Sequence, residues 1–138
     1  MKQDEIELRL IEKNPGDGEM LPFHYYDITI VRTDVTVGKI SLRFGNNFHS
    51  YYNGHVGFEI FPEYQGNNYA FQAATQILDI AKKHALYELH LTCKQSNSAS
   101  RRIFEKLTAN FIEIVKIPKN CFFYREGIED YAIYRLTL

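Results

Sequence analysis

Residues 61–70 read Phe-Pro-Glu-Tyr-Gln-Gly-Asn-Asn-Tyr-Ala and separate two segments that differ in periodicity. The segment before them, residues 55–60, is short and apolar, as expected for a strand. The segment after them, from about Tyr69 to His84, repeats alanine and isoleucine at spacings of three and four residues, which predicts an amphipathic helix. A turn containing Gly66 therefore precedes the first backbone N–H groups of a helix. Those groups lack intrahelical partners and carry the positive end of the helix dipole, so the turn predicts an anion site, most often one for phosphate or pyrophosphate.

A second strand and helix follow about 25 residues later. Residues 89–93, Leu-His-Leu-Thr-Cys, are a short apolar strand. They lead into residues 97–107, which read Asn-Ser-Ala-Ser-Arg-Arg-Ile-Phe-Glu-Lys-Leu. Asn97 or a neighbouring serine is a reasonable N-cap for this helix.

Together the two segments resemble the paired signature of the GNAT superfamily, the acyl-CoA-dependent N-acyltransferases. Family members carry Arg/Gln-x-x-Gly-x-Gly/Ala after the fourth strand, commonly as Arg-Gly-x-Gly-Tyr-Ala. Residues 65–70, Gln-Gly-Asn-Asn-Tyr-Ala, are similar to this motif and place Asn68 where the second glycine usually stands. Asparagine tolerates a left-handed backbone better than most residues, so the departure is modest.

The second family motif, Asn-x-x-Ser/Ala-x-x-x-Tyr-Glu-Lys-x-Gly-Phe, follows the fifth strand. Phenylalanine replaces the usual tyrosine at position 104, and the pair 109–110 stands where glycine is common. The resemblance covers residues 55–116 well and the rest loosely. The matching positions are Asn97, Ser100, Phe104, Glu105, Lys106 and Phe111.

The composition bounds the class of protein. A length of 138 residues indicates one domain, residues 1–138, and a net charge of −1 argues against general nucleic-acid binding. No stretch approaches the roughly 18 apolar residues of a membrane span, and the polar N-terminus lacks the layout of a signal peptide. Cys93 and Cys121 show neither metal-ligand spacing nor a disulfide framework, and the five histidines show no two-ligand helical spacing. We therefore expect a cytoplasmic domain without a metal, a membrane contact or a nucleic-acid partner.

The remaining segments predict further strands. The first predicted strand contains Ile6, Leu8 and Leu10, which alternate with charged residues. A hairpin is predicted from residues 25–33 and 35–44. The last two strands are predicted at residues 111–117 and 131–138. Residues 45–53 and 118–130 are expected to be loops. The prediction is an α/β (mixed α+β) domain with a central, mixed, seven-strand sheet flanked by helices, in agreement with the GNAT fold.

One departure from the family concerns the first connection. Relatives usually place one or two helices between the first two strands, where they wall the acceptor site. Residues 13–24 contain Pro15, Gly16, Gly18 and Pro22 and are too short and too broken for such helices. The acceptor pocket should then be built by the 45–54 loop, by the 118–130 loop, or by a second subunit in a homodimer.

The resemblance implies an acetyl-CoA site with no metal. The pyrophosphate would lie on the backbone of Gln65, Gly66, Asn67, Asn68, Tyr69 and Ala70. The pantetheine arm would pair with the main chain around Phe58 and Ile60, and Asn97 would hydrogen-bond the pantetheine or acyl region. Arg101 and Arg102 are both placed to approach the phosphates, and Ser100 and Arg102 are assigned to the cofactor. Plainer alternatives are a turn that only caps a helix, an ordinary core strand, a simple N-cap at Asn97, and a solvated face at Arg101 and Arg102.

The catalytic groups are less well defined. Glu59 is the first candidate for the general base, against the alternative of an outward salt bridge. Phe104 cannot donate a proton, but a CoA thiol with a pKa near 8.5, by analogy with cysteine, is a fair leaving group without an acid. Tyr124 and Tyr134 are weaker acid candidates, and Cys93 is expected to be a half-buried structural thiol.

The sequence therefore predicts an N-acetyltransferase that moves an acetyl group from acetyl-CoA to an amine by direct transfer in a ternary complex. The acceptor is not specified by any motif. One alternative is a non-catalytic CoA-binding or regulatory module of the same fold, favoured by Asn68 and Phe104. A second is an interaction domain without a cofactor.

Overall fold

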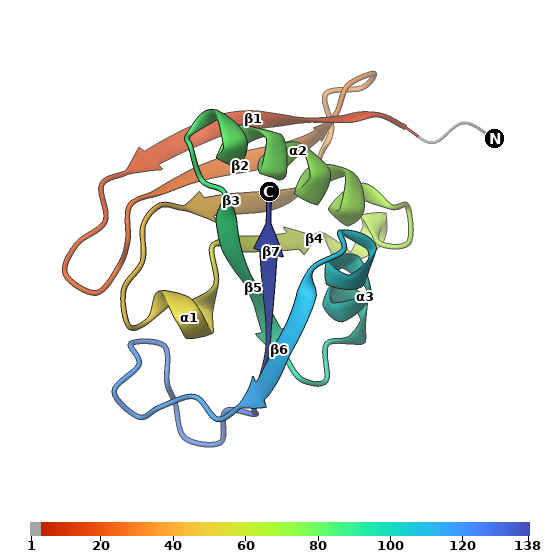
Figure 1. Ribbon diagram of the computed structural model, residues 1–138. Coiled ribbons are helices and arrows are strands. Elements are labelled where there is room, and N and C mark those ends of the chain that lie inside the picture. Colours follow the sequence, from red (N-terminus) through yellow and green to blue (C-terminus); the bar gives the residue numbers. More distant parts are fainter. Residues whose placement is uncertain (1–3) are drawn as a thin grey trace.

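The computed structural model describes residues 4–138 and contains strands, helices and short loops in the order that Figure 1 shows. The elements are β1 (Ile6–Asn14), β2 (Phe23–Ile30), β3 (Thr36–Arg43), α1 (Ser50–Asn53), β4 (Val56–Ile60), the 3-10 helix η1 (Pro62–Tyr64), α2 (Tyr69–Lys83), β5 (Glu88–Lys94), α3 (Ser98–Lys106), β6 (Asn110–Val115) and β7 (Tyr131–Thr137). No helix within these residues is both long and apolar enough to cross a membrane.

The strands form two antiparallel sheets, one in the order β1-β2-β3-β4 and one in the order β5-β7-β6. The predicted α/β class and the seven strands are confirmed. The expected single sheet is instead divided between β4 and β5. A backbone hydrogen bond from His55 N to His90 O, 2.8 Å long, joins the two segments where β4 begins. Beyond it the strands separate and cross at a steep angle (Figure 1).

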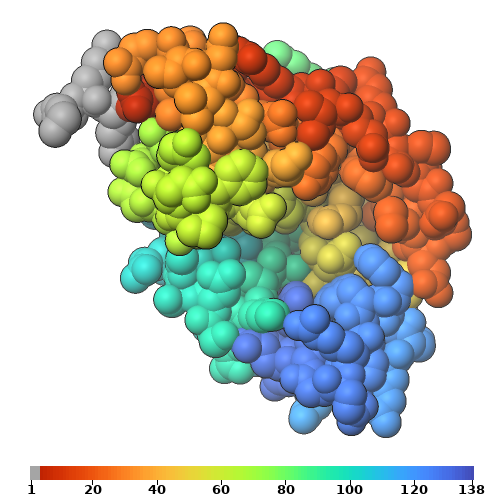
Figure 2. All heavy atoms as spheres, turned by 180° about the vertical axis from the view of Figure 1, so that it is seen from behind, coloured from red at the N-terminus to blue at the C-terminus, as the bar shows by residue number. Residues whose placement is uncertain are grey.

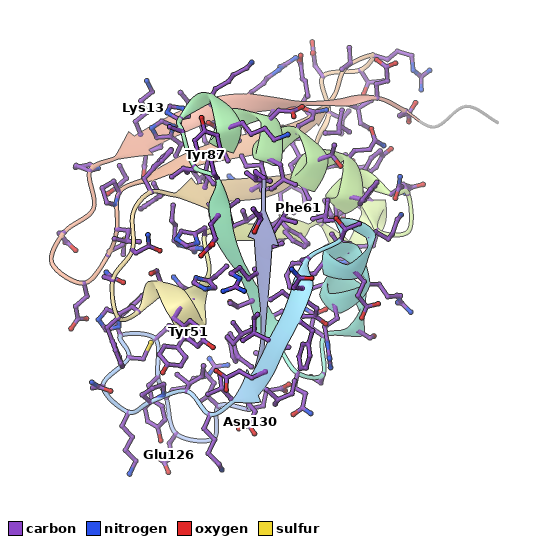
Figure 3. All side chains as sticks on the ribbon, viewed as in Figure 1. Lys13, Tyr51, Phe61, Tyr87, Glu126 and Asp130 are labelled. Carbon is purple, nitrogen blue, oxygen red and sulfur yellow. The ribbon has the colours of Figure 1, made fainter. Side chains whose placement is uncertain are left out.

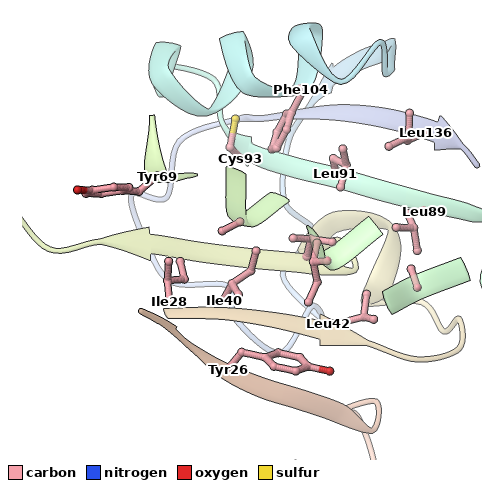
Figure 4. Packing of buried hydrophobic residues seen from close by; sticks show 14 of the residues in the cluster. Tyr26, Ile28, Ile40, Leu42, Tyr69, Leu89, Leu91, Cys93, Phe104 and Leu136 are labelled. Atoms are coloured by element: carbon pink, nitrogen blue, oxygen red, sulfur yellow. The ribbon is translucent and has the colours of Figure 1, made fainter. Parts of the chain in front are cut away.

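One apolar core runs through both sheets. Helix α2 buries Ala73, Ala74, Ile77 and Ala81, the face that its periodicity predicts. These small residues let the helix pack closely on the first sheet, whose Ile28, Ile40 and Leu42 are fully buried. Figure 4 shows Phe104 of α3 reaching the same core from the side of β5.

The predicted loop at residues 45–53 contains the short helix α1. Periodicity cannot reveal a four-residue helix, and local hydrogen bonds hold it in place. Asn47 Oδ1 accepts from Ser50 N at 2.9 Å, and Asn47 N donates to Ser50 Oγ at 2.9 Å. By contrast, the prediction of no helix between β1 and β2 is confirmed, since Asp17 and Met20 form an isolated bridge in a turn there.

The face of the first sheet opposite α2 is polar. Strand register places Arg9, Asp27, Lys39 and Glu59 in one row across the four strands, with charges that alternate in sign. Within this row Lys39 Nζ lies 3.5 Å from Asp27 Oδ1. This face can therefore remain in water without the helices that would otherwise cover it.

A buried imidazole closes the junction between the sheets. His55 is 2% exposed, and its Nδ1 accepts a hydrogen bond from His90 N at 2.9 Å. Since Nδ1 accepts, Nε2 carries the proton and donates to Gly45 O, also at 2.9 Å. Burial lowers the pKa of His55 below its ordinary value of 6.5, so the ring is neutral in the folded protein.

We expect the protein to lose stability as the pH falls below about 6.5, because protonation of His55 would remove its Nδ1 acceptor. The folded state binds fewer protons than the unfolded state in this range, so the free energy of unfolding decreases as the pH decreases. His55→Gln should lower that free energy at pH 7.5 by about 1–3 kcal/mol and should flatten its dependence on pH. Urea titrations at about pH 5.5 and about pH 7.5 measure both effects. A variant with the wild-type slope would contradict this role for the ring.

Candidate functional site

A groove of about 730 Å³ opens where the two sheets separate. One wall is the turn after β4 with the first residues of α2, and the other wall is α3. Figure 2 shows it from behind, between residues 60–70 in lime green and α3 in teal. Of the residues that the family resemblance assigns to the cofactor, all but Asn67 line this groove: Phe58, Ile60, Gln65, Gly66, Asn68, Tyr69, Ala70, Asn97, Ser100 and Arg102.

The turn owes its shape to two residues with left-handed backbones. Gly66 has φ +84°, and a Cβ built on it would meet no atom within 4 Å, so the turn is open on this side. Asn68 has φ 65° and ψ 16° and precedes α2. Asparagine can therefore replace the family's second glycine here, because it adopts the left-handed conformation that the position requires.

Side chains of the turn fasten its backbone. Gln65 Nε2 donates to Ile60 O at 3.0 Å and ties the turn to the end of β4. Asn67 Nδ2 donates to Tyr64 O at 3.0 Å, which explains why this side chain is absent from the groove lining. The turn is thus held in one shape before any ligand arrives.

The start of α2 is suited to an anion. No side chain caps the helix, and its first turn contains no acidic residue. The ring of Tyr69 is 6% exposed and its hydroxyl lies 3.3 Å from Asp4 Oδ2, so this residue offers mainly its backbone to the groove. The first N–H groups of the helix lack intrahelical partners and point toward the turn.

On the opposite wall, Asn97 is the N-cap of α3. Its Oδ1 accepts from Ser100 N at 3.1 Å, which is the simple capping role that the sequence left open, although both residues also line the groove. The adjacent arginines diverge. Arg101 Nε donates to Tyr134 Oη at 3.1 Å, whereas Arg102 lines the groove.

Lys106 is a groove residue that the sequence analysis did not assign. Its Nζ lies 4.1 Å from the centre of the Phe71 ring, so a cation–π contact joins the walls formed by α3 and α2. Its position four residues after Arg102, on the same helical face, was the available signal. Arg102 and Lys106 give this wall a positive charge.

The candidate catalytic residues lie in different environments. Glu59 is exposed and lines the groove from β4, with Lys39 as its cross-strand neighbour. Tyr124 belongs to the loop before β7 and does not line the groove; its hydroxyl lies 3.3 Å from Glu126 Oε2. In Figure 3, Glu126 lies at the bottom of the molecule, well away from Phe61 at the end of β4.

Three other groups have structural roles. Phe104 is 2% exposed and packs edge-on against Tyr134, whose hydroxyl is engaged by Arg101. Burial raises the pKa of the Cys93 thiol to about 11, so it is protonated at neutral pH and is not a nucleophile. Over residues 4–138 there is no cluster of histidine, cysteine or acidic side chains that could hold a metal ion.

Comparison with known proteins identifies the family. A family model described as "Acetyltransferase (GNAT) domain" matches residues 2–110. Curated proteins give no match. Similar solved structures include a GNAT-family acetyltransferase from Bacillus anthracis, with 23% identity, a TM-score of 0.63, and coverage of 82% of this chain and 65% of that one.

Two other structures share the fold. The ribosomal-protein-S5-alanine acetyltransferase from Vibrio fischeri has 20% identity and a TM-score of 0.66, covering 83% of this chain and 61% of that one. The microcin self-immunity acetyltransferase MccE, solved in complex with acetyl-CoA and AMP, has 13% identity and a TM-score of 0.64, covering 84% and 61%. This chain thus spans 61–65% of the length of these three structures.

The family match covers most of the chain, including the turn that opens the groove, and the solved structures share its fold over the matched part. The chain belongs to the GNAT acetyltransferase family.

Proposed function

We propose that this protein transfers an acetyl group from acetyl-CoA to an amine while both substrates are bound. The observation that carries the proposal is the groove itself, because it lies where the sheets part and is lined by the turn, by the edge of β4 and by α3. One solved structure that shares this fold, at 13% identity, is an acetyltransferase in complex with acetyl-CoA and AMP. The acceptor is proposed only as an amine.

The groove would supply contacts for the pyrophosphate and for the pantetheine arm of CoA. Backbone N–H groups at the start of α2 would bind the pyrophosphate, and Arg102 and Lys106 would add charge. Past His55, the edge of β4 that faces β5 has no strand partner among the described residues. Its main-chain groups at Phe58 and Ile60 can therefore pair with the amide groups of pantetheine.

Glu59 is our proposed general base. A lysine-like amine with a pKa of about 10.4 requires roughly 4.6 kcal/mol to lose its proton at neutral pH, whereas an α-amino group with a pKa near 8 requires about 1.4 kcal/mol. A carboxylate on β4 beside the thioester would accept this proton directly or through a water molecule. The CoA thiolate would leave without an acid, since Tyr124 does not line the groove.

A second candidate function is a CoA-binding module without catalysis. It is favoured by Phe104, a buried side chain with no proton to donate at the position of the family's usual tyrosine. Release of free thiol from acetyl-CoA in the presence of amines separates the two functions, because a module would bind the cofactor without turnover.

Calorimetric titration with acetyl-CoA tests the groove assignment, with desulfo-CoA and ATP as comparison ligands. We expect micromolar binding that requires both pyrophosphate and pantetheine. Gly66→Val should abolish it without unfolding the domain, because a β-branched side chain is strained at φ +84° and would fill the open side of the turn.

Gly127→Val is the matched control for the turn. Gly127 has φ +83° and equally open surroundings, but it lies outside the groove. Similar strain should lower the stability of both variants, while only the Gly66 variant loses the ligand. Unchanged affinity in Gly66→Val would remove the turn from the site.

The two adjacent arginines should give opposite results. Arg102→Gln should weaken acetyl-CoA binding about tenfold with little effect on stability, because one charge-assisted hydrogen bond to phosphate is lost. Arg101→Gln should leave affinity unchanged but lower the free energy of unfolding, since Tyr134 loses its partner. Calorimetry and urea unfolding on both variants test this contrast, and equal affinities would contradict it.

Replacing the proposed base separates chemistry from binding. Glu59→Gln should lower kcat about 10²- to 10⁴-fold with the best amine from a panel of α-amino, lysine-like and polyamine acceptors. Acetyl-CoA affinity should not change. Glu63→Gln, in η1 and outside the groove lining, is the control and should retain full activity. Equal rates for the two variants would rule out Glu59 as the base.

A further inference from the structure

Arg43 lies beyond the inner end of the groove. It is the last residue of β3, and its side chain extends across β4 over Gly57. A Cβ on Gly57 would lie 3.5 Å from Arg43 Nη2 and 3.7 Å from Nη1. Gly57 and Glu59 are two residues apart on one strand and point to the same face. The guanidinium of Arg43 and the carboxylate of Glu59 therefore share a face of β4, with about 7 Å of strand between their positions.

Although Glu19 and Arg43 line the same small hollow, no carboxylate of residues 4–138 forms an ion pair with this guanidinium. Its one side-chain hydrogen bond runs from Nη1 to Gly54 O, 3.2 Å away, although the group has five N–H donors. Elsewhere in residues 4–138, Arg9, Arg32 and Lys39 each pair with a carboxylate at the surface. Arg43 is partly buried, and burial lowers its pKa, yet no carboxylate of the described chain pairs with it. A desolvated cation with spare donors is unfavourable unless an anion completes it.

The polar groups beside Arg43 do not neutralise it: some are hydrogen-bonded elsewhere, and Glu19, which lines the same small hollow, makes no ion pair with the guanidinium. Asn47 and Ser50 exchange hydrogen bonds, and His49 Nδ1 accepts from Phe122 N at 3.1 Å. The hollow that they form beside Arg43 measures about 10 Å³, room for one water molecule. The donors of Arg43 that face neither Gly54 O nor this hollow are left for the β4 side. There Figure 2 shows a recess that continues from the groove, with residues of about 45–55, in yellow, at its floor.

We propose that Arg43 binds a carboxylate on the acceptor, so that the acceptor is an amine that also bears a carboxylate. This inference rests on the proposed function, because it takes Glu59 as the place where the amine loses its proton. A planar guanidinium pairs well with a carboxylate through two parallel hydrogen bonds. A carboxylate also matches the single available charge, since the next cation on this face, Lys39, is already paired with Asp27.

The test compares γ-aminobutyrate with γ-aminobutyramide, which share amine and carbon chain and differ only in the carboxylate. Each is titrated into the CoA-saturated protein while the backbone amide resonances of Gly57 and Glu59, which every variant retains, are followed by NMR. We expect a saturable shift at millimolar concentration with the acid and at least tenfold weaker binding of the amide. Arg43→Gln should bind the two probes equally weakly, whereas Lys39→Gln, a loss of the same charge on the same strand face, should retain the preference.

Arg43→Lys is the control for a folding defect, because lysine keeps the positive charge near Gly54 O but lacks the planar guanidinium. This variant should fold and should bind the acid at least several-fold more weakly than the wild type. Equal affinity for acid and amide, wild-type binding by Arg43→Gln, or no saturable shift would overturn the inference. Calorimetry with acetyl-CoA on the same samples distinguishes this failure from failure of the proposed function, since cofactor binding does not involve Arg43.

Discussion

The separation of β4 from β5 is the constraint on which the rest of the structure depends. Main-chain groups in a protein interior need partners, and a strand that parts from its neighbour leaves one edge unsatisfied. Within residues 4–138 the main chain of β4 is joined to β5 only where β4 begins, beside His55. Both ring nitrogens of His55 form hydrogen bonds at the junction, one with Gly45 O and one with His90 N. Beyond the junction the two sheets share a core but are not joined by strand pairing. The same parting creates a groove and leaves one edge of β4 without a strand partner among the described residues, which is the edge that the proposed function assigns to pantetheine.

The walls of the groove are prepared in different ways. The turn before α2 is held by side-chain amides that donate to its own carbonyls, so its shape does not depend on the ligand. The opposite wall begins with a capped helix whose two adjacent arginines serve different purposes, one joined to Tyr134 and one directed at the groove. Under the proposed function, neighbouring residues of a single helical turn would thus serve structure and binding.

Local patterns predicted much of the fold and the turn of the groove, whereas the other groove residues were assigned by the family resemblance. The face of α2, the hairpin of β2 and β3 and the turn around Gly66 each depend on residues close together in sequence, so periodicity and turn chemistry identify them. The division into two sheets could not be predicted this way, because it depends on His55 meeting His90, which lies 35 residues later. Tyr124 was assigned from a loop without periodicity, and that loop does not reach the groove.

The contact of Lys106 with Phe71 has a consequence for the entry of a ligand. A cation–π pair at an exposed site contributes about 0.5–1 kcal/mol, close to the thermal energy, so this bridge between the two walls acts as a weak latch. It opens with a rotation of one side chain, on the timescale of nanoseconds or less. In the proposed function, the ammonium released from the ring would then be available to a phosphate of the cofactor, and a hydrogen bond to such a charged group is worth about 1.5–3 kcal/mol. A ligand phosphate that displaces Lys106 from Phe71 would therefore replace the lost cation–π contact with a stronger hydrogen bond.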